Sequence, residues 1–175
     1  GALKQAEFTL GKMTIICGGN NSGKTYATHA TFGFLDYIRN SLEFPLKSND
    51  LTTLLEDGAI VIDLDEYIRD INKYLSSASK KYSKNLRSVF TGSEKNFEEA
   101  SFSFRIEQVQ KKKPTQISMS FGSAGKNFLK IKAAERGNCI EATLLVDKQA
   151  DDAPPSHLIE RMLVDSIREA VLGNL

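Results

Sequence analysis

Apolar residues recur at helical spacing in several parts of this chain, and they predict its helices. One helix is expected over residues 24–40, a long one over 64–89 and a last one over 157–172. A shorter helix is expected over 50–57, where Gly58 can end it. In the first of these helices the apolar positions are Tyr26, Ala30, Phe34 and Ile38.

From residue 100 onward the period of the apolar positions changes to two, which is typical of strands with one buried face. Four segments share this pattern, at residues 102–106, 117–121, 128–131 and 140–146. We expect them to form a four-stranded antiparallel meander, which makes residues 100–146 an antiparallel β-subdomain.

The apolar run Met13–Cys17 predicts a short buried strand, and a second short strand is expected over residues 6–10. Directly after the run comes Gly18–Thr25, GGNNSGKT, which fits the phosphate-binding loop pattern G-x-x-x-x-G-K-[S/T]. Strand, glycine-rich loop and helix in this order are the context that the motif requires. The sequence therefore predicts an α/β fold (an α+β fragment) in which a P-loop nucleotide-binding core carries the antiparallel subdomain.

The residue types of this loop suit a triphosphate. Gly18, Gly19 and Gly23 allow the backbone to curl, so that its N–H groups point inward as an anion nest. The following helix adds the positive end of its dipole. We expect Lys24 to reach the β- and γ-phosphates of ATP and Thr25 to hold Mg²⁺. The expected nucleotide-binding residues are Gly18, Gly19, Asn20, Asn21, Ser22, Gly23, Lys24, Thr25 and Tyr26.

Residues 8–39 resemble the start of ATPases of the ABC/SMC/RecF/OLD type, whose loop typically follows the pattern G-x-N-x-S-G-K-[S/T]. The matching positions are Gly18, Asn20, Ser22, Gly23, Lys24 and Thr25. Asn21 stands where many members carry glycine, and this variant is similar to the AAA-type ATPases of OLD nucleases and bacterial defence systems. The resemblance implies ATP sandwiched between two heads of a homodimer, with hydrolysis that drives work on DNA or on a partner effector.

ATPase heads of this type are generally longer than 175 residues. They carry a signature serine loop, a second acidic strand motif and a switch histidine downstream, none of which is convincingly present in this chain. The chain also starts with Gly1 in place of methionine. We therefore expect residues 1–175 to be the N-terminal lobe of a larger ATPase.

Composition excludes some classes of function. The net charge of +1 provides no bulk electrostatic argument for nucleic acid. Cys17 and Cys139 lack metal-site spacing, so we expect reduced thiols, with Cys17 as a small core residue. No apolar run is long enough to span a membrane and no signal peptide is visible. These features predict a cytoplasmic protein without a membrane partner.

Residues 60–66, IVIDLDE, imitate the acidic strand motif of P-loop ATPases. In that interpretation Asp63 or Asp65 holds the metal ion, and Glu66 is the candidate catalytic residue that orients water. The alternative is that Asp63 begins the next helix and Glu66, three residues on, completes a capping box. The apolar run is very short for a central strand, which favours the capping interpretation.

Two basic segments could contact DNA phosphates. The first is a helix face formed by Lys80, Lys81, Lys84 and Arg87. The second is a turn formed by Lys111, Lys112 and Lys113. Solvated surfaces explain them as well, and no interleaved aromatic residues mark a base-stacking platform. His29 and His157 have no nearby Ser, Cys or acid that suggests catalysis, so we expect both at the surface or in packing.

Three hypotheses follow. The first is the nucleotide-binding lobe of an ATPase of the SMC/RecF/OLD group. The second is a small P-loop kinase or GTPase that uses Asp63 or Asp65, although an antiparallel meander argues against the alternating parallel strands and helices of such enzymes. The third is a non-hydrolysing interaction module, in which bound ATP only shapes a dimer or a partner surface.

Overall fold

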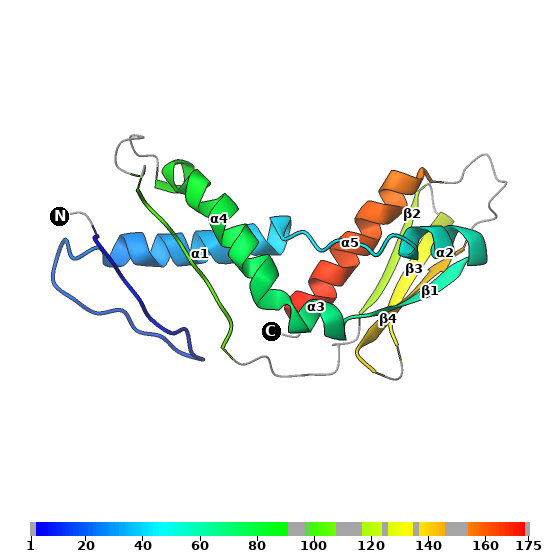
Figure 1. Ribbon diagram of the computed structural model, residues 1–175, viewed down its shortest axis with the longest axis horizontal. Coiled ribbons are helices and arrows are strands. Elements are labelled where there is room, and N and C mark those ends of the chain that lie inside the picture. The colour runs from blue at the N-terminus through cyan, green and yellow to red at the C-terminus, as the bar shows by residue number, and fades with distance from the viewer. Residues whose placement is uncertain are drawn as a thin grey trace. The chain divides into compact units, whose positions relative to one another are not determined.

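The computed structural model describes residues 3–90, 97, 99–107, 117–123, 126–134, 137–145 and 154–173. Its helices are α1 (Lys24–Ser41), α2 (Asp50–Asp57), α3 (Asp65–Arg69), α4 (Ile71–Phe90) and α5 (Ser156–Gly173). Its strands are β1 (Ala59–Asp63), β2 (Ser118–Ser123), β3 (Lys126–Ala133) and β4 (Cys139–Leu144). The described chain is thus a mixed α+β structure with an antiparallel sheet (Figure 1).

Two compact units share these elements. Unit 1 comprises Gly1–Ser41 and Leu75–Phe104, and it contains α1 and most of α4. Unit 2 comprises Leu42–Tyr74 and Arg105–Leu175, and it contains the sheet with α2, α3 and α5. The phosphate-loop motif therefore belongs to unit 1, and the acidic segment around Asp63 belongs to unit 2.

The core of unit 1 is an aromatic cluster around Phe34 of α1, whose side chain is fully buried. The centroid of the Phe34 ring lies 5.3 Å from that of Tyr82 on α4 and 4.8 Å from that of Phe102. The Tyr82 hydroxyl donates a hydrogen bond of 3.0 Å to the carbonyl oxygen of Ala30. These contacts fix α4 where it crosses α1 (Figure 1).

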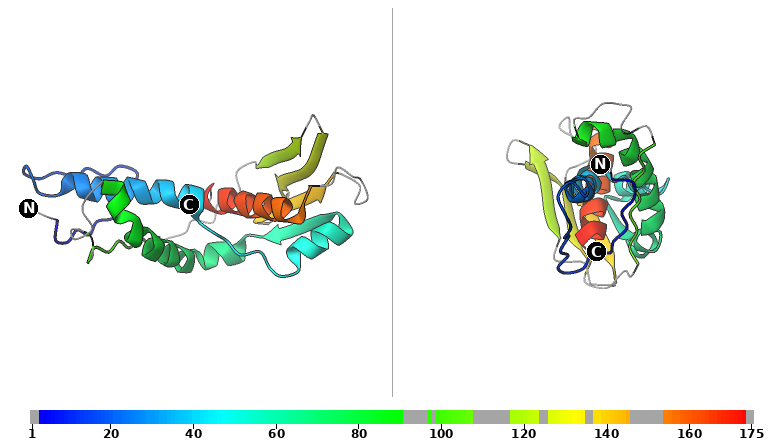
Figure 2. Two further views of the ribbon diagram at one scale, coloured as in Figure 1. Left: turned by 90° about the horizontal axis from the view of Figure 1, so that it is seen from above. Right: turned by 90° about the vertical axis from the view of Figure 1, so that its left-hand side faces the viewer.

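In unit 2 the four strands are all antiparallel and lie in the order β1-β4-β3-β2. Ile60, Ala142, Ile131 and Met119 are neighbours in successive strands, and they form one row across the sheet. The Ser166 hydroxyl of α5 lies 3.8 Å from the Met119 sulfur, which places α5 against this face (Figure 2).

The predicted helices are confirmed with small changes. α1, α2 and α5 lie where periodicity places them, and Gly58 ends α2 with a φ of +80° and a hydrogen bond of 3.0 Å to Leu54. The predicted long helix is divided at Asp70 into α3 and α4. None of the described helices combines the length and the apolar character that a membrane span needs.

The prediction of a strand over residues 102–106 is wrong, because these residues belong to no strand. Their side chains do alternate between half-buried and exposed, as the sequence pattern predicts. Side chains of α4 bind its backbone: Ser83 accepts the N–H of Phe102 at 2.9 Å, and Asn72 accepts the N–H of Ile106 at 2.8 Å. The fourth strand of the sheet is instead β1, which pairs with β4. Residue 146 and Lys111–Lys113 lie outside the described residues.

The two strands predicted before the phosphate loop are also absent: residues 6–10 and residues 12–17 do not form strands. Figure 1 shows this part of the chain in blue, as backbone that turns back on itself before it leads into α1, with the bend at Lys12 and Met13. Met13 is 80% exposed and Ile15 is 70% exposed, and Cys17 is an exposed free thiol where a core residue was expected. A strand needs a partner for its backbone and its apolar face. No described strand supplies one, so the described residues contain no parallel P-loop core.

The contact between Gly33 and Tyr82 makes a prediction about stability. A Cβ atom at residue 33 would lie 2.5 Å from the Tyr82 hydroxyl oxygen. Glycine-to-alanine changes inside helices ordinarily stabilise by about 1 kcal/mol, but we expect Gly33→Ala to destabilise the protein by about 1–2 kcal/mol because it displaces this ring. In a Tyr82→Phe background the same change is expected to be neutral or stabilising. Urea unfolding of the four proteins measures the coupling.

The matched control is Gly173→Ala at the end of α5, where an added Cβ would meet no atom within 4 Å. It is expected to leave stability nearly unchanged. Equal effects of Gly33→Ala in both backgrounds would show that the Tyr82 hydroxyl does not determine the spacing of the two helices.

Candidate functional site

The loop from Gly18 to Gly23 curves around the side chain of Lys24. The Lys24 ammonium donates to the Gly18 carbonyl oxygen at 2.7 Å, and it also reaches the Gly19 carbonyl and, at 3.3 Å, the Ser22 hydroxyl. Three acceptors of the loop therefore hold the positive charge inside the curve. The lysine contributes its charge to the loop and has no part in an apolar core.

Two residues of the loop have backbone conformations that few residues adopt. Gly23 has a φ of +87° and Asn21 has a φ of +61°. Asparagine is one of the few residues other than glycine that enters this left-handed region readily. The conformation explains why asparagine can stand at this position of the loop. Gly19 has no such requirement, because a Cβ there would meet nothing within 4 Å.

The N-terminal end of α1 follows the loop directly and faces it. α1 begins at Lys24, and the Ala27 N–H donates to the Gly23 carbonyl oxygen at 3.0 Å. The N–H groups of the three preceding residues have no acceptor within the helix, so they point out of its end. Thr25 and Tyr26 are exposed beside these donors. Free N–H groups, a helix dipole and an ammonium group in one place favour an anion.

The acidic segment in unit 2 serves the local structure. The Asp63 carboxylate accepts the N–H of Asp65 at 2.8 Å. The predicted capping box is not formed, because Asp63 ends β1 and the N-cap of α3 is Leu64, which has no side-chain cap. Glu66 forms an ion pair of 2.6 Å with Lys47. The hydrogen bond and the charge of Lys47 hold the pKa of Glu66 below its usual value and raise the pKa of Lys47. Glu66 is thus a carboxylate that already has a cationic partner.

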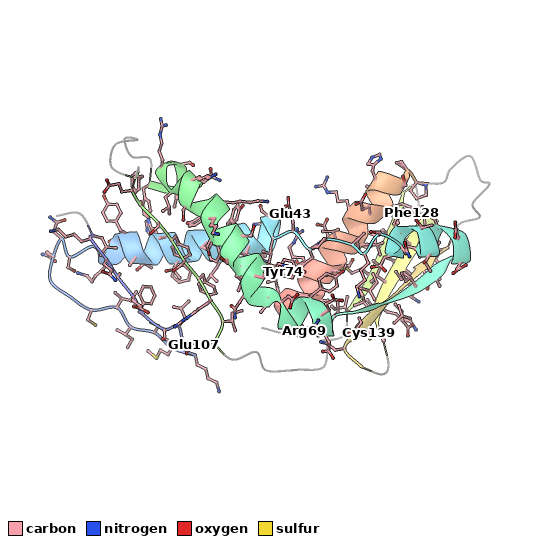
Figure 3. All side chains as sticks on the ribbon, viewed as in Figure 1. Glu43, Arg69, Tyr74, Glu107, Phe128 and Cys139 are labelled. Atoms are coloured by element: carbon pink, nitrogen blue, oxygen red, sulfur yellow. The ribbon has the colours of Figure 1, made fainter. Side chains whose placement is uncertain are left out.

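The strand that leads to these acids differs from the central parallel strand of a nucleotide-binding core. β1 is an edge strand, and it pairs antiparallel with β4. The Asn138 amide approaches Asp65 at 3.3 Å, and Cys139, labelled in Figure 3 at the start of β4, is opposite Asp63 in the register. Burial raises the pKa of the Cys139 thiol, and the nearby carboxylates of Asp63 and Asp65 raise it further.

The structure therefore brings the loop residues together in unit 1, and it places the acidic candidates together in unit 2. A role for Asp63 or Asp65 in binding metal, and for Glu66 in orienting water, stays a prediction. In the described ranges, no three His, Cys, Asp or Glu side chains are grouped to hold a metal ion. Mg²⁺ is commonly bound through one or two protein groups and the phosphates of a nucleotide, so the prediction for Thr25 does not require such a group.

The remaining candidates are at the surface. All four basic side chains of the helix face are exposed on α4, namely Lys80, Lys81, Lys84 and Arg87. His157 is exposed at the start of α5, and His29 is exposed on α1, where its ring stacks on that of Phe90. Sequence reasoning missed Lys47 as the partner of Glu66 and Phe90 as a neighbour of Tyr26, because both pairs are distant in the sequence.

The conformation of Asn21 predicts how the loop responds to substitution. Asn21→Gly keeps the positive φ and is expected to leave nucleotide binding intact. Asn21→Val places a β-branched residue in the left-handed region at a cost of about 1–3 kcal/mol. We expect it to weaken ATP binding roughly tenfold or more. Calorimetric titration with ATP and Mg²⁺ compares the two variants, and equal affinities would show that the binding-competent loop does not use this conformation.

Comparison of this chain with protein-family models, with curated proteins and with solved structures finds no significant match. The case for the site therefore depends on the loop sequence and on the geometry described above.

Proposed function

We propose that this chain binds ATP with Mg²⁺ through the loop from Gly18 to Thr25. One observation supports the proposal most strongly: the loop curves around the Lys24 ammonium directly before the open end of α1. A glycine turn that merely joins two elements does not require this arrangement. A simple glycine turn does not need a lysine whose ammonium lies inside the loop. It also does not need residues that match every fixed position of the phosphate-binding pattern.

Each part of the loop has a chemical role in this proposal. Backbone N–H groups of the loop and of the first turn of α1 would donate to phosphate oxygens. Lys24 would neutralise charge on the β- and γ-phosphates, and the Thr25 hydroxyl would be a ligand of Mg²⁺. When bound at Thr25, Mg²⁺ would supply positive charge that stabilises the phosphates. The exposure of Thr25 leaves its hydroxyl accessible for that role.

The finer proposal is that the chain is the nucleotide-binding lobe of an ATPase of the SMC/RecF/OLD group. A parallel core of that kind needs a strand directly before the loop. In the segment over residues 12–17, Lys12 and Met13 form a bend, and residues 14–17 with the exposed Ile15 supply the short stretch that such a strand would use. The finer proposal is supported in this respect only by the fact that this segment is free to pair with a neighbouring strand.

The rest of the assignment follows from the resemblance. In the whole protein, ATP would be sandwiched between the heads of a homodimer, and hydrolysis would drive work on DNA or a defence effector. We place such a protein in the cytoplasm. If the lobe takes part in DNA binding, the exposed basic face of α4 is the described surface that would contact phosphates.

A second candidate is a non-hydrolysing module that uses bound ATP to shape a dimer or partner surface. The ion pair of 2.6 Å between Glu66 and Lys47 favours it, because a carboxylate that binds a lysine is less available to orient water. The kinase or GTPase alternative has less support, since β1 lies in an antiparallel sheet.

Lys24→Ala tests the binding site. We expect it to lower ATP affinity by about 100-fold or more, since the lysine contributes charged hydrogen bonds to several phosphate oxygens. The fold should persist, because Lys24 contacts the loop and not the core of unit 1. The matched control is Lys84→Ala, an exposed lysine of the same unit that should leave affinity unchanged. Unchanged ATP affinity of Lys24→Ala by calorimetry would refute the assignment.

Turnover of ATP by this chain tests whether the acidic segment around Glu66 is catalytic. We expect this 175-residue chain to bind ATP but to form no more ADP than the Lys24→Ala variant does, because phosphoryl transfer needs further groups assembled around the γ-phosphate. Release of phosphate in a coupled assay measures it. Robust turnover that disappears in Glu66→Gln would assign a catalytic role to Glu66 and exclude the non-hydrolysing module.

A further inference from the structure

A second aromatic cluster lies beside the phosphate loop, at the start of α1. The ring centroids of Tyr26 and Phe90 are 5.1 Å apart, and their planes make an angle of 46°. His29, one turn further along α1, stacks on Phe90 at 6.5 Å with nearly parallel planes. The ring of Phe97 also stacks on that of Phe90, with centroids 5.5 Å apart. All four residues belong to unit 1.

This cluster differs from the one around Phe34, which forms the core of unit 1. Tyr26 is 49% exposed, although it is a large aromatic residue with three other rings in its cluster. Phe90 and Phe97 are half-buried, so the cluster becomes more exposed toward Tyr26. The Tyr26 ring is therefore supported on one side by Phe90, and much of its remaining surface is open.

The position of Tyr26 in the helix relates it to the loop. It follows Lys24 and Thr25 directly, in the first turn of α1. Side chains of a helix tilt toward its N-terminus, which is the end where the loop holds the Lys24 ammonium. In a nucleotide the base is separated from the phosphates by a single ribose. The Tyr26 ring lies within one helical turn of the phosphate site, so it is close enough to contact the base of a bound nucleotide.

We propose that Tyr26 is the platform on which the base of the bound nucleotide stacks, with Phe90 as its support. This inference rests on the proposed function, because it concerns the same bound nucleotide. Support from Phe90 restricts the motion of the Tyr26 ring before binding, which reduces the entropy that stacking costs. Every base has a π-face, so a stacking platform discriminates little among bases. The ligand class is therefore a nucleoside triphosphate without selection of the base, with ATP and GTP bound alike.

The test compares ATP with inorganic tripolyphosphate, which has the phosphates but no base. Calorimetry in the presence of Mg²⁺ should show that the protein binds both, and that it binds ATP more tightly. Tyr26→Ala should lower the affinity for ATP by roughly 5- to 150-fold, the range expected for one stacked base, and should leave the affinity for tripolyphosphate unchanged. Tyr26→Phe keeps the ring and should keep the affinity for ATP.

The matched control is Phe32→Ala. Phe32 is another exposed aromatic residue of α1, with 66% of its surface accessible, and it lies almost two turns beyond Tyr26. Its loss should change neither affinity. This control separates a specific role of Tyr26 from a general effect of removing a surface ring from the helix.

A spectroscopic readout is available because the chain contains no tryptophan. Tyr26→Trp introduces a single indole, which can be excited without its tyrosine neighbours. Stacking of a base on the indole should change its fluorescence when ATP or GTP is added. Saturation with tripolyphosphate should leave the fluorescence unchanged.

The outcomes distinguish this inference from the function on which it rests. If the protein binds neither ligand, the phosphate site itself is refuted and the platform with it. If it binds both with equal affinity, or if Tyr26→Ala weakens both equally, the phosphate site stands and the platform is refuted. Unchanged ATP affinity in Tyr26→Ala, with no fluorescence response in Tyr26→Trp, would also refute it.

Discussion

The packing of Tyr82 against α1 is the contact on which unit 1 depends. Its ring lies beside Phe34, and its hydroxyl binds the carbonyl of Ala30 in the space that Gly33 leaves open. This contact sets the distance between α1 and α4, so it also sets where the end of α4 meets the start of α1. The phosphate loop and the Tyr26–Phe90 contact therefore depend on a core contact that lies about two helical turns away.

The sequence predicted those parts of the fold that periodicity determines. α1, α2, α5 and the strands β2 to β4 are such parts, because their apolar positions repeat along the chain itself. Periodicity does not identify the partner of an extended segment. Residues 102–106 show this limit, since Ser83 and Asn72 bind their backbone and β1 takes the expected place in the sheet.

The candidate site shows the same division. The motif predicted the loop and the helix that follows, because these are local in the chain. The left-handed conformation of Asn21 gives a physical reason why asparagine is accommodated in the loop. The ion pair of Lys47 with Glu66 and the contact of Tyr26 with Phe90 join residues distant in the sequence. Such pairs follow from tertiary packing, and no pattern along a single sequence displays them.

The exposed run Met13–Cys17 has a consequence for the behaviour of the chain in solution. It contains no charge and no proline, and its apolar residues are exposed on backbone that belongs to no helix or strand. These are the features of segments that add to one another as strands and begin aggregation. Lys12, directly before the run, is the charge that opposes such self-addition. Solubility at high concentration therefore depends on whether another strand covers these five residues.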